Sequence, residues 1–161
     1  MKAPRSLVFL RMILEAASLT GAIILVALYA LTAAMLPRPY VPYDAEEGLV
    51  SVYGMGTILT ALFAMGEGLM GLLIMLSRFP KMYRPPVALN SGNIEIQYVL
   101  SKIMHSSLQI ICAVYFSVLM ILVYQMRIQV ESNLFLTMSV AALIACGFIY
   151  LLYFSAARRY K

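Results

Sequence analysis

The sequence predicts an all-α integral membrane protein, a four-helix bundle with both chain ends in the cytoplasm. Two features of the composition indicate this class: 63% of the 161 residues are hydrophobic, and only 12% are charged. A water-soluble domain carries about a quarter charged residues, roughly twice that share. The third feature is a set of four long apolar runs, and at ~20 residues per crossing a single domain of this length accommodates four helices.

The four helices are expected at about residues 10–36, 50–77, 92–126 and 133–157. The runs are continuously apolar, whereas the strands of a membrane barrel alternate in segments of about ten residues. Lys2 and Arg5 precede the first run, as basic residues do in a signal peptide. Its apolar stretch exceeds the about 7–15 residues of a signal sequence, so we expect a retained first helix.

Proline residues divide the first three runs. Pro37 and Pro42 follow the first run, and Pro80 and Pro86 follow the second. Proline fixes φ and disfavours helix in the residue before it, so the chain is expected to leave each helix in an extended segment. Asn90 is expected to cap the helix that forms the third crossing.

Basic residues predict the orientation. Of the twelve Lys and Arg, ten lie at the N-terminus, after the second run and at the C-terminus, and two lie in the first and third connections. Basic residues near membrane ends stay on the cytoplasmic side, so we expect a protein of the bacterial cytoplasmic membrane with both termini in the cytoplasm. The formal charge of +5 follows from this topology, and no basic face for nucleic acid is expected.

Neither a cofactor, nor a metal, nor an enzymatic activity is expected. Cys112 and Cys146 lie inside apolar runs without a C-x-x-C pair and are interpreted as packing residues. Residues 66–71 satisfy G-x-G-x-x-G, but a dinucleotide fingerprint must follow a strand, and this segment lies inside a membrane helix. No nucleophile, base and metal ligands cluster in the sequence.

Glu67 is the most anomalous residue, because it lies nine positions from the inner end of its run and therefore ~14 Å deep. An unpaired carboxylate there costs several kcal/mol. Three interpretations stay open: a neutral acid bonded within the bundle, an acid that binds a partner helix, or an acid that relays protons or binds a cation in transport. Candidate partners are Gln109, His105 and Thr20.

Two further polar groups lie near the inner boundary. Lys102, His105 and Gln109 share one helix face by their spacing. His105 is interpreted as interfacial or packing polarity, with a pH-sensitive link to the midplane acid as the alternative; one imidazole cannot assemble a multi-histidine metal site. Arg11 and Glu15 are four residues apart and are expected to form a local ion pair.

Small residues recur at four-residue spacing around the midplane acid, at Gly56, Thr60, Ala64 and Gly68. Small residues at this interval let membrane helices approach closely. Packing within the chain and self-association between copies both account for this spacing.

The connection after the second run carries a spaced pattern of nine residues: Arg78, Phe79, Pro80, Tyr83, Pro86, Val87, Asn93, Gln97 and Tyr98. This pattern resembles the R-[FY]-P…[FY]-x-x-P-V…N-x-x-x-Q-Y signature of a bacterial four-helix membrane domain of unknown function. That domain forms the amino-terminal part of the immunity protein against the sporulation-delaying toxin and also occurs alone in small membrane proteins. The resemblance implies a membrane protein with an immunity-like role.

The first connection carries part of the outer-loop motif of the same family. The matching residues are Pro37, Pro42, Gly48, Tyr53 and Gly54, and the His-aromatic-Asn centre of the motif is absent. Asp44, Glu46 and Glu47 make this connection acidic. They are interpreted as a solvated loop, with attraction of a cation or a basic peptide as the alternative.

The second connection is interpreted as a linker anchored at the membrane surface, with a docking surface for a partner as the alternative. Ile94, Tyr98 and Ile96 are expected along the headgroup boundary, with Glu95 and Lys102 in water.

The leading functional hypothesis is a non-enzymatic membrane protein, an immunity-like, regulatory or accessory subunit that acts through protein contacts. Its expected partners are membrane lipid and another membrane protein or a second copy. The alternative is a small proton- or cation-coupled transporter that uses Glu67.

Overall fold

The computed structural model describes residues 3–35, 52–79, 86–126 and 132–160. Within these ranges the chain forms four helices and no strand: α1 (Arg5–Met35), α2 (Val52–Arg78), α3 (Ile94–Met126) and α4 (Ser132–Arg159). All four are long and apolar enough to cross a membrane. The prediction of an all-α chain with four apolar helices is confirmed.

The helix bounds differ from the expected ones mainly at the start of α1. This helix begins at Arg5, five residues before the first expected position, and the amides of Leu7 and Val8 donate to the Pro4 carbonyl at 3.0 and 3.2 Å. Proline is favoured at helix starts because its missing N–H needs no partner there. Hydropathy marks the apolar part of a crossing, whereas the backbone hydrogen bonds of α1 continue beyond it.

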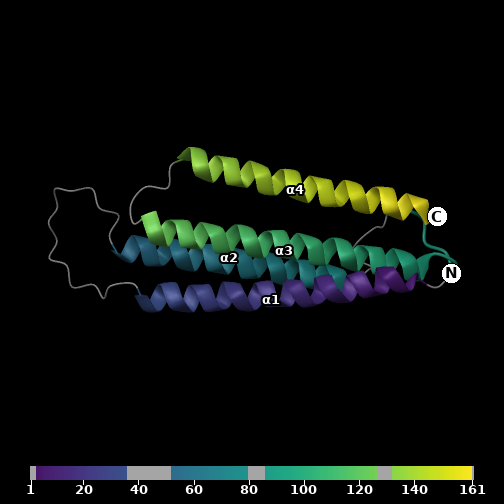
Figure 1. Cartoon of the computed structure of the whole chain (residues 1–161), viewed down its shortest axis with the longest axis horizontal. Helices are drawn as coiled ribbons and strands as arrows, with labels where there is room; N and C mark the ends of the chain where they lie inside the picture. The colour runs from purple at the N-terminus through teal and green to yellow at the C-terminus, as the bar shows by residue number, and fades with distance from the viewer. Residues whose placement is uncertain (1–2, 36–51, 80–85, 127–131, 161) are drawn as a thin grey trace.

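The helices alternate in direction along the bundle (Figure 1). α1 and α3 begin at the end of the molecule where α2 and α4 finish, so α1 and α3 run parallel to each other. The starts of α1 and α3 and the ends of α2 and α4 therefore share one end, which is called the terminal end below.

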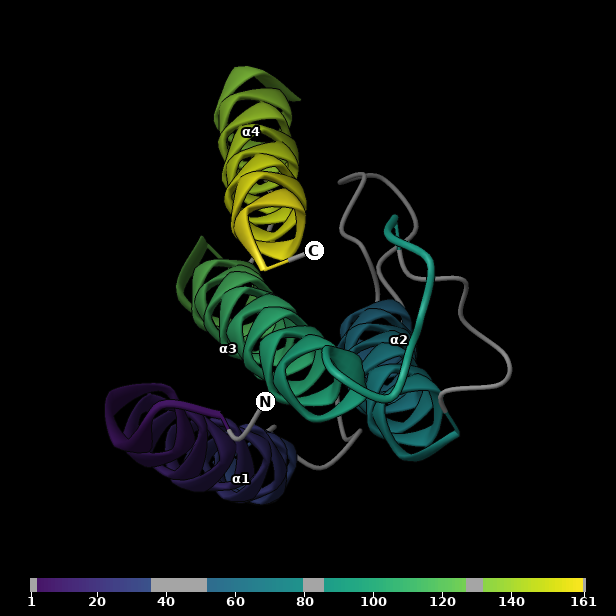
Figure 2. The same ribbon diagram turned by 90° about the vertical axis from the view of Figure 1, so that its right-hand side faces the viewer.

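α3 is the central helix. It packs against α1, α2 and α4, and α1 also packs against α2. The end-on view in Figure 2 shows α1, α2 and α3 grouped together, with α4 lying along the other side of α3. The bundle is therefore a three-helix group to which α4 is attached mainly through α3.

Two apolar clusters form the core. The first joins α1, α2 and α3 and contains Leu25, Leu59, Met70, Ala113, Phe116 and Met120. The second lies at the terminal end, between the α2–α3 connection, α3 and α4, and contains Val87, Ile96, Leu100, Met104, Tyr153 and Ala157.

Two glycines set the distances between the helices of the first cluster. A Cβ atom added to Gly21 of α1 would lie 2.9 Å from the Cβ of Ala113 in α3. A Cβ added to Gly66 of α2 would lie 2.8 Å from Leu25 Cδ2 and 3.1 Å from Phe116 Cβ. α1 and α2 thus approach their neighbours as closely as the missing side chains allow.

Candidate functional site

Glu67 lies close to the middle of α2, and its Oε1 atom is buried without a hydrogen-bond partner among the described residues. None of the three expected partners donates to this atom. The Thr20 hydroxyl donates to the Ala16 carbonyl at 3.0 Å, and Nδ1 of His105 donates to the Ser101 carbonyl at 2.7 Å. The interpretation of Glu67 as an acid satisfied within the bundle is therefore wrong for Oε1.

A stripe of small residues beside Glu67 forms part of the outward surface of α2, next to exposed long side chains such as Met65 and Leu69. Thr60, Ala64, Gly68 and Gly71 are exposed and follow one another at three- and four-residue steps, which places them on one side of the helix. Cβ atoms added to Gly68 or Gly71 would meet nothing within 4 Å. These four residues, with Glu67 at their edge, are called the α2 small-residue face below.

One interpretation of the small residues at four-residue spacing was that they pack against other helices of the same chain. At Gly68 it is wrong, because no other part of the described chain approaches this residue; the packed glycine is Gly66, two positions earlier. Thr60 is hydrogen-bonded inside the chain: its hydroxyl donates to the Gly56 carbonyl at 2.8 Å and lies 3.1 Å from the hydroxyl of Tyr29, with which it shares a hydrogen bond. Gly56 is partly buried and Ala64 is exposed. Self-association, the other interpretation of the spacing, stays a prediction.

Long apolar side chains are exposed on α1 and α4 as they are on α2 beside the α2 small-residue face, and α4 has one open glycine, Gly147. α1 exposes Leu19 and Leu31, and α4 exposes Leu143, Ile144 and Phe148, with Leu143 72% exposed. Long apolar side chains of this kind suit contact with lipid tails. A face of glycine, alanine and threonine instead allows another helix to reach the backbone.

Two cysteines lie in the same middle section of the molecule. Cys112 of α3 and Cys146 of α4 are both free. The Cys112 thiol donates to the Gly66 carbonyl, with sulfur and oxygen 3.8 Å apart, and it lies within electrostatic range of Glu67 and Cys146. No group of three metal-ligating side chains occurs in the parts of the chain that the structure describes.

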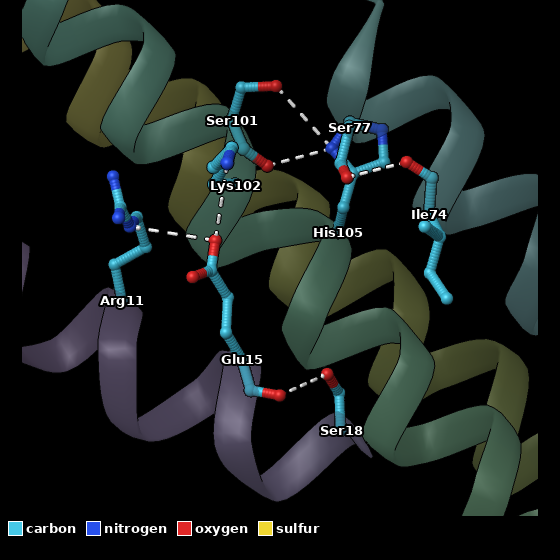
Figure 3. Close-up of polar contacts among 8 residues, drawn as sticks. All are labelled: Arg11, Glu15, Ser18, Ile74, Ser77, Ser101, Lys102 and His105. Atoms are coloured by element: carbon cyan, nitrogen blue, oxygen red, sulfur yellow. Dashed lines mark hydrogen bonds and ion pairs between the residues drawn. The ribbon is translucent and has the colours of Figure 1, made fainter. Parts of the chain in front are cut away.

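Buried polar side chains follow α3 from the terminal end toward the middle. They are Gln97, Ser101, His105, Ser106 and Gln109. Lys102, which the spacing places on the same face as His105 and Gln109, turns toward α1 instead (Figure 3).

An ion-pair cluster joins α1 to α3 near the terminal end (Figure 3). Oε1 of Glu15 lies 3.5 Å from Nε of Arg11, which confirms the expected local pair. The same oxygen lies 3.5 Å from Nζ of Lys102 in α3. Sequence spacing did not reveal this second pair, because its partners are 87 positions apart.

The end of the α2–α3 connection is held by two asparagines. Oδ1 of Asn90 accepts from the amides of Gly92 and Asn93, and Oδ1 of Asn93 accepts from the amide of Asn90, all at 2.9 Å. Nδ2 of Asn93 donates to the Ala88 carbonyl at 3.0 Å. The prediction that Asn90 caps the helix is confirmed, and its cap is reciprocal.

Gln97 fastens the start of α3 to the end of α4. Its Nε2 donates to the carbonyls of Ala157 and Tyr160 at 2.9 and 3.1 Å. The last carbonyls of a helix have no partner within it, so a side-chain donor stabilises them. Gln97 belongs to the nine-residue pattern of the sequence, but the pattern did not predict this contact with α4.

The remaining residues of the nine-residue pattern divide between surface and core. Val87 is buried, Pro86 is partly buried, and Arg78 and Phe79 are exposed. Tyr98 is exposed with its ring centroid 5.0 Å from Nζ of Lys102. Pro80 and Tyr83 lie outside the described residues, as do Pro37, Pro42, Asp44, Glu46, Glu47 and Gly48 of the first connection; Tyr53 and Gly54 lie in the first turn of α2.

The expectation for the start of α3 is only partly correct. Ile94 is exposed, as expected for a residue at the headgroup boundary. Ile96 is 1% exposed and belongs to the second core cluster, so its predicted surface position is wrong. α4 covers it, and a local pattern cannot show which side of a helix a distant helix covers.

No family model, no curated protein and no solved structure matches the chain. The side chains described above therefore carry the functional inference.

Proposed function

We propose that this chain is a non-enzymatic multi-pass protein of the bacterial cytoplasmic membrane that acts through contact with another membrane protein, as an immunity-like, regulatory or accessory subunit. The α2 small-residue face, with the unpartnered Oε1 of Glu67 at its edge, is the observation that carries the proposal. A second copy of the chain is an alternative occupant of this face.

The energetic reason lies in the position of Glu67. A charged side chain at the centre of a membrane helix costs about 2.5–3.5 kcal/mol on insertion scales. Hydrogen bonds between membrane helices contribute about 0.6–2 kcal/mol each. A donor from a partner helix that lies against Gly68 and Gly71 would satisfy Oε1 and recover part of this cost.

The charge distribution and the family resemblance support the same proposal. Ten of the twelve basic residues lie, by sequence, in the N-terminal part, between the end of α2 and the first turns of α3, or in the C-terminal part, which favours a cytoplasmic location of the terminal end. The nine-residue pattern resembles that of a domain found in a toxin-immunity protein, and such a protein acts by contact. Neither feature requires an enzymatic centre.

Photo-crosslinking in intact cells tests the proposal. A photoreactive residue at Gly68 should give one defined protein adduct, whereas the same residue at Leu143 of α4 should crosslink to lipid alone. Gly68→Leu should abolish the Gly71 adduct without loss of folding, because space is open at this position. Absence of any protein adduct from Gly68 and Gly71 would remove the proposal.

A proton- or cation-coupled transporter that uses Glu67 is the second candidate. The buried polar run of α3, from Ser101 to Gln109, favours it because it leads from the terminal end toward the middle of the molecule. Reconstituted wild-type protein should then support flux across proteoliposomes, and Glu67→Gln should abolish it. Absence of flux in the wild type would exclude this candidate.

A further inference from the structure

The ion-pair cluster of Arg11, Glu15 and Lys102 contains two cations and one anion. Both cations approach the same oxygen, Oε1 of Glu15, at 3.5 Å. The other described carboxylates are Glu67, in the middle of α2, and Glu95, which accepts from the Ala3 amide at 3.4 Å. The cluster therefore retains one uncompensated positive charge.

The cations also retain donors. Nε of Arg11 is buried and makes no hydrogen bond in the described structure, since its contact with Glu15 is an ion pair at 3.5 Å. Figure 3 shows the terminal nitrogens of Arg11 directed away from Glu15. The side chains of Arg11 and Lys102 are 26% and 20% exposed, so both cations are partly buried yet accessible to a ligand.

The depth of the cluster fits the border between headgroups and hydrocarbon. α1 has 31 residues and is about 46 Å long, which exceeds a ~30 Å hydrocarbon core by about 8 Å at each end. Arg11 lies about 9 Å from the start of α1, and Lys102 about 12 Å from the start of α3. The carboxylate of Glu15 lies at the same level, because it is 3.5 Å from both cations.

We propose that Arg11 and Lys102 bind the phosphate of an anionic phospholipid at the terminal end of the α1–α3 contact. Arginine presents a planar set of donors that matches phosphate, and lysine adds a point charge. The uncompensated charge favours a lipid with a net negative headgroup over a zwitterionic one. Met12 and Ile13 of α1 are exposed directly after Arg11, on the side toward the middle of the molecule, and provide apolar surface for the acyl chains.

Glu15 has a defined role in this site. Its carboxylate holds the two cations together while it competes with the lipid phosphate for them. Replacement by glutamine keeps the size of the side chain and removes the competing charge. Glu15→Gln should therefore strengthen lipid binding, an effect that damage to the fold would not produce.

Native mass spectrometry of the delipidated full-length chain in non-ionic detergent tests the site. Phosphatidylglycerol should bind about tenfold more tightly than phosphatidylcholine, and inorganic phosphate should not compete at equal concentration. Arg11→Gln and Lys102→Gln should each bring phosphatidylglycerol to the phosphatidylcholine level. Arg159→Gln is the matched control, because Arg159 lies at the same end on α4 and is exposed outside the cluster; it should leave binding unchanged.

Four outcomes would overturn the proposal. Equal binding of the two lipids, or a loss in Arg159→Gln as large as in Arg11→Gln, would indicate only general attraction to a basic surface. Weaker binding by Glu15→Gln would show that the carboxylate does not compete with the lipid. Effective competition by inorganic phosphate would indicate a site for a free anion. These outcomes are independent of the proposed partner contact, which uses α2.

Discussion

Substitution of Gly21 by alanine should push α1 away from α3. The added Cβ would lie 2.9 Å from the Cβ of Ala113, at least 0.5 Å closer than the 3.4 Å at which ordinary contact begins. The Ala113 Cβ is bonded directly to the backbone, so only a movement of one helix relieves the overlap. Overpacking of this kind costs about 1–3 kcal/mol.

The measured loss will be smaller than this cost, because alanine stabilises a helix by about 1 kcal/mol relative to glycine. Gly68→Ala is the matched control, since the added Cβ meets nothing within 4 Å. This variant should therefore show the helix stabilisation by alanine without any overpacking. The difference in unfolding free energy between Gly21→Ala and Gly68→Ala should therefore be about 1–3 kcal/mol. This difference isolates the contact between α1 and α3.

Reversible unfolding in mixed detergent micelles, followed by circular dichroism, supplies the free energies. Ala113→Gly in the Gly21→Ala background moves the methyl group from one helix to the other and should restore most of the loss. The double variant would then be more stable than the sum of the single effects predicts. Equal stability of Gly21→Ala and Gly68→Ala would refute the close approach of α1 and α3.

Three further substitutions test single hydrogen-bonded contacts. Asn90→Ala removes the reciprocal cap of α3 and should cost about 1 kcal/mol in the same unfolding assay, whereas Ser91→Ala at the next, exposed position should cost nothing measurable; equal effects would contradict the cap. Gln97→Leu removes both hydrogen bonds to the end of α4 and should accelerate amide hydrogen exchange in the last turn of α4 but not in α2. Unchanged exchange in the last turn of α4 would argue that Gln97 does not hold the two helices together. Tyr115→Phe removes the 2.7 Å bond to the Ser139 hydroxyl and should cost about 0.5–1.5 kcal/mol. A double-mutant cycle with Ser139→Ala should give a coupling energy of about this size, and strictly additive losses would argue against the bond.

The four long apolar helices were predictable from hydropathy, because the sequence contains four apolar runs of the length that a bilayer crossing would require. The helix starts were less predictable, since a helix can continue past the apolar segment with its backbone still bonded. The Asn90 cap was predictable because its partners lie within three residues. Each correct prediction thus depends on local chemistry or on segment length.

The details of the site depended on contacts between distant residues. Gly66 and Gly68 are indistinguishable in the sequence, yet one is packed against Leu25 and the other faces open space. In lipid, both the interior and the exterior of a bundle are apolar, so composition does not identify the inward face. Likewise, Gln97 finds its acceptors 60 and 63 positions away.

The central position of α3 has a consequence for biosynthesis. Under the proposed membrane location, a ribosome delivers α1 and α2 to the bilayer before α3 exists, so these two helices enter without the helix against which both of them pack. During that interval Gly21 lacks its neighbour Ala113, Gly66 keeps Leu25 of α1 but lacks Phe116, and Glu15 lacks Lys102. Arrival of α3 then completes the first apolar cluster, which a nascent chain that stops earlier would lack.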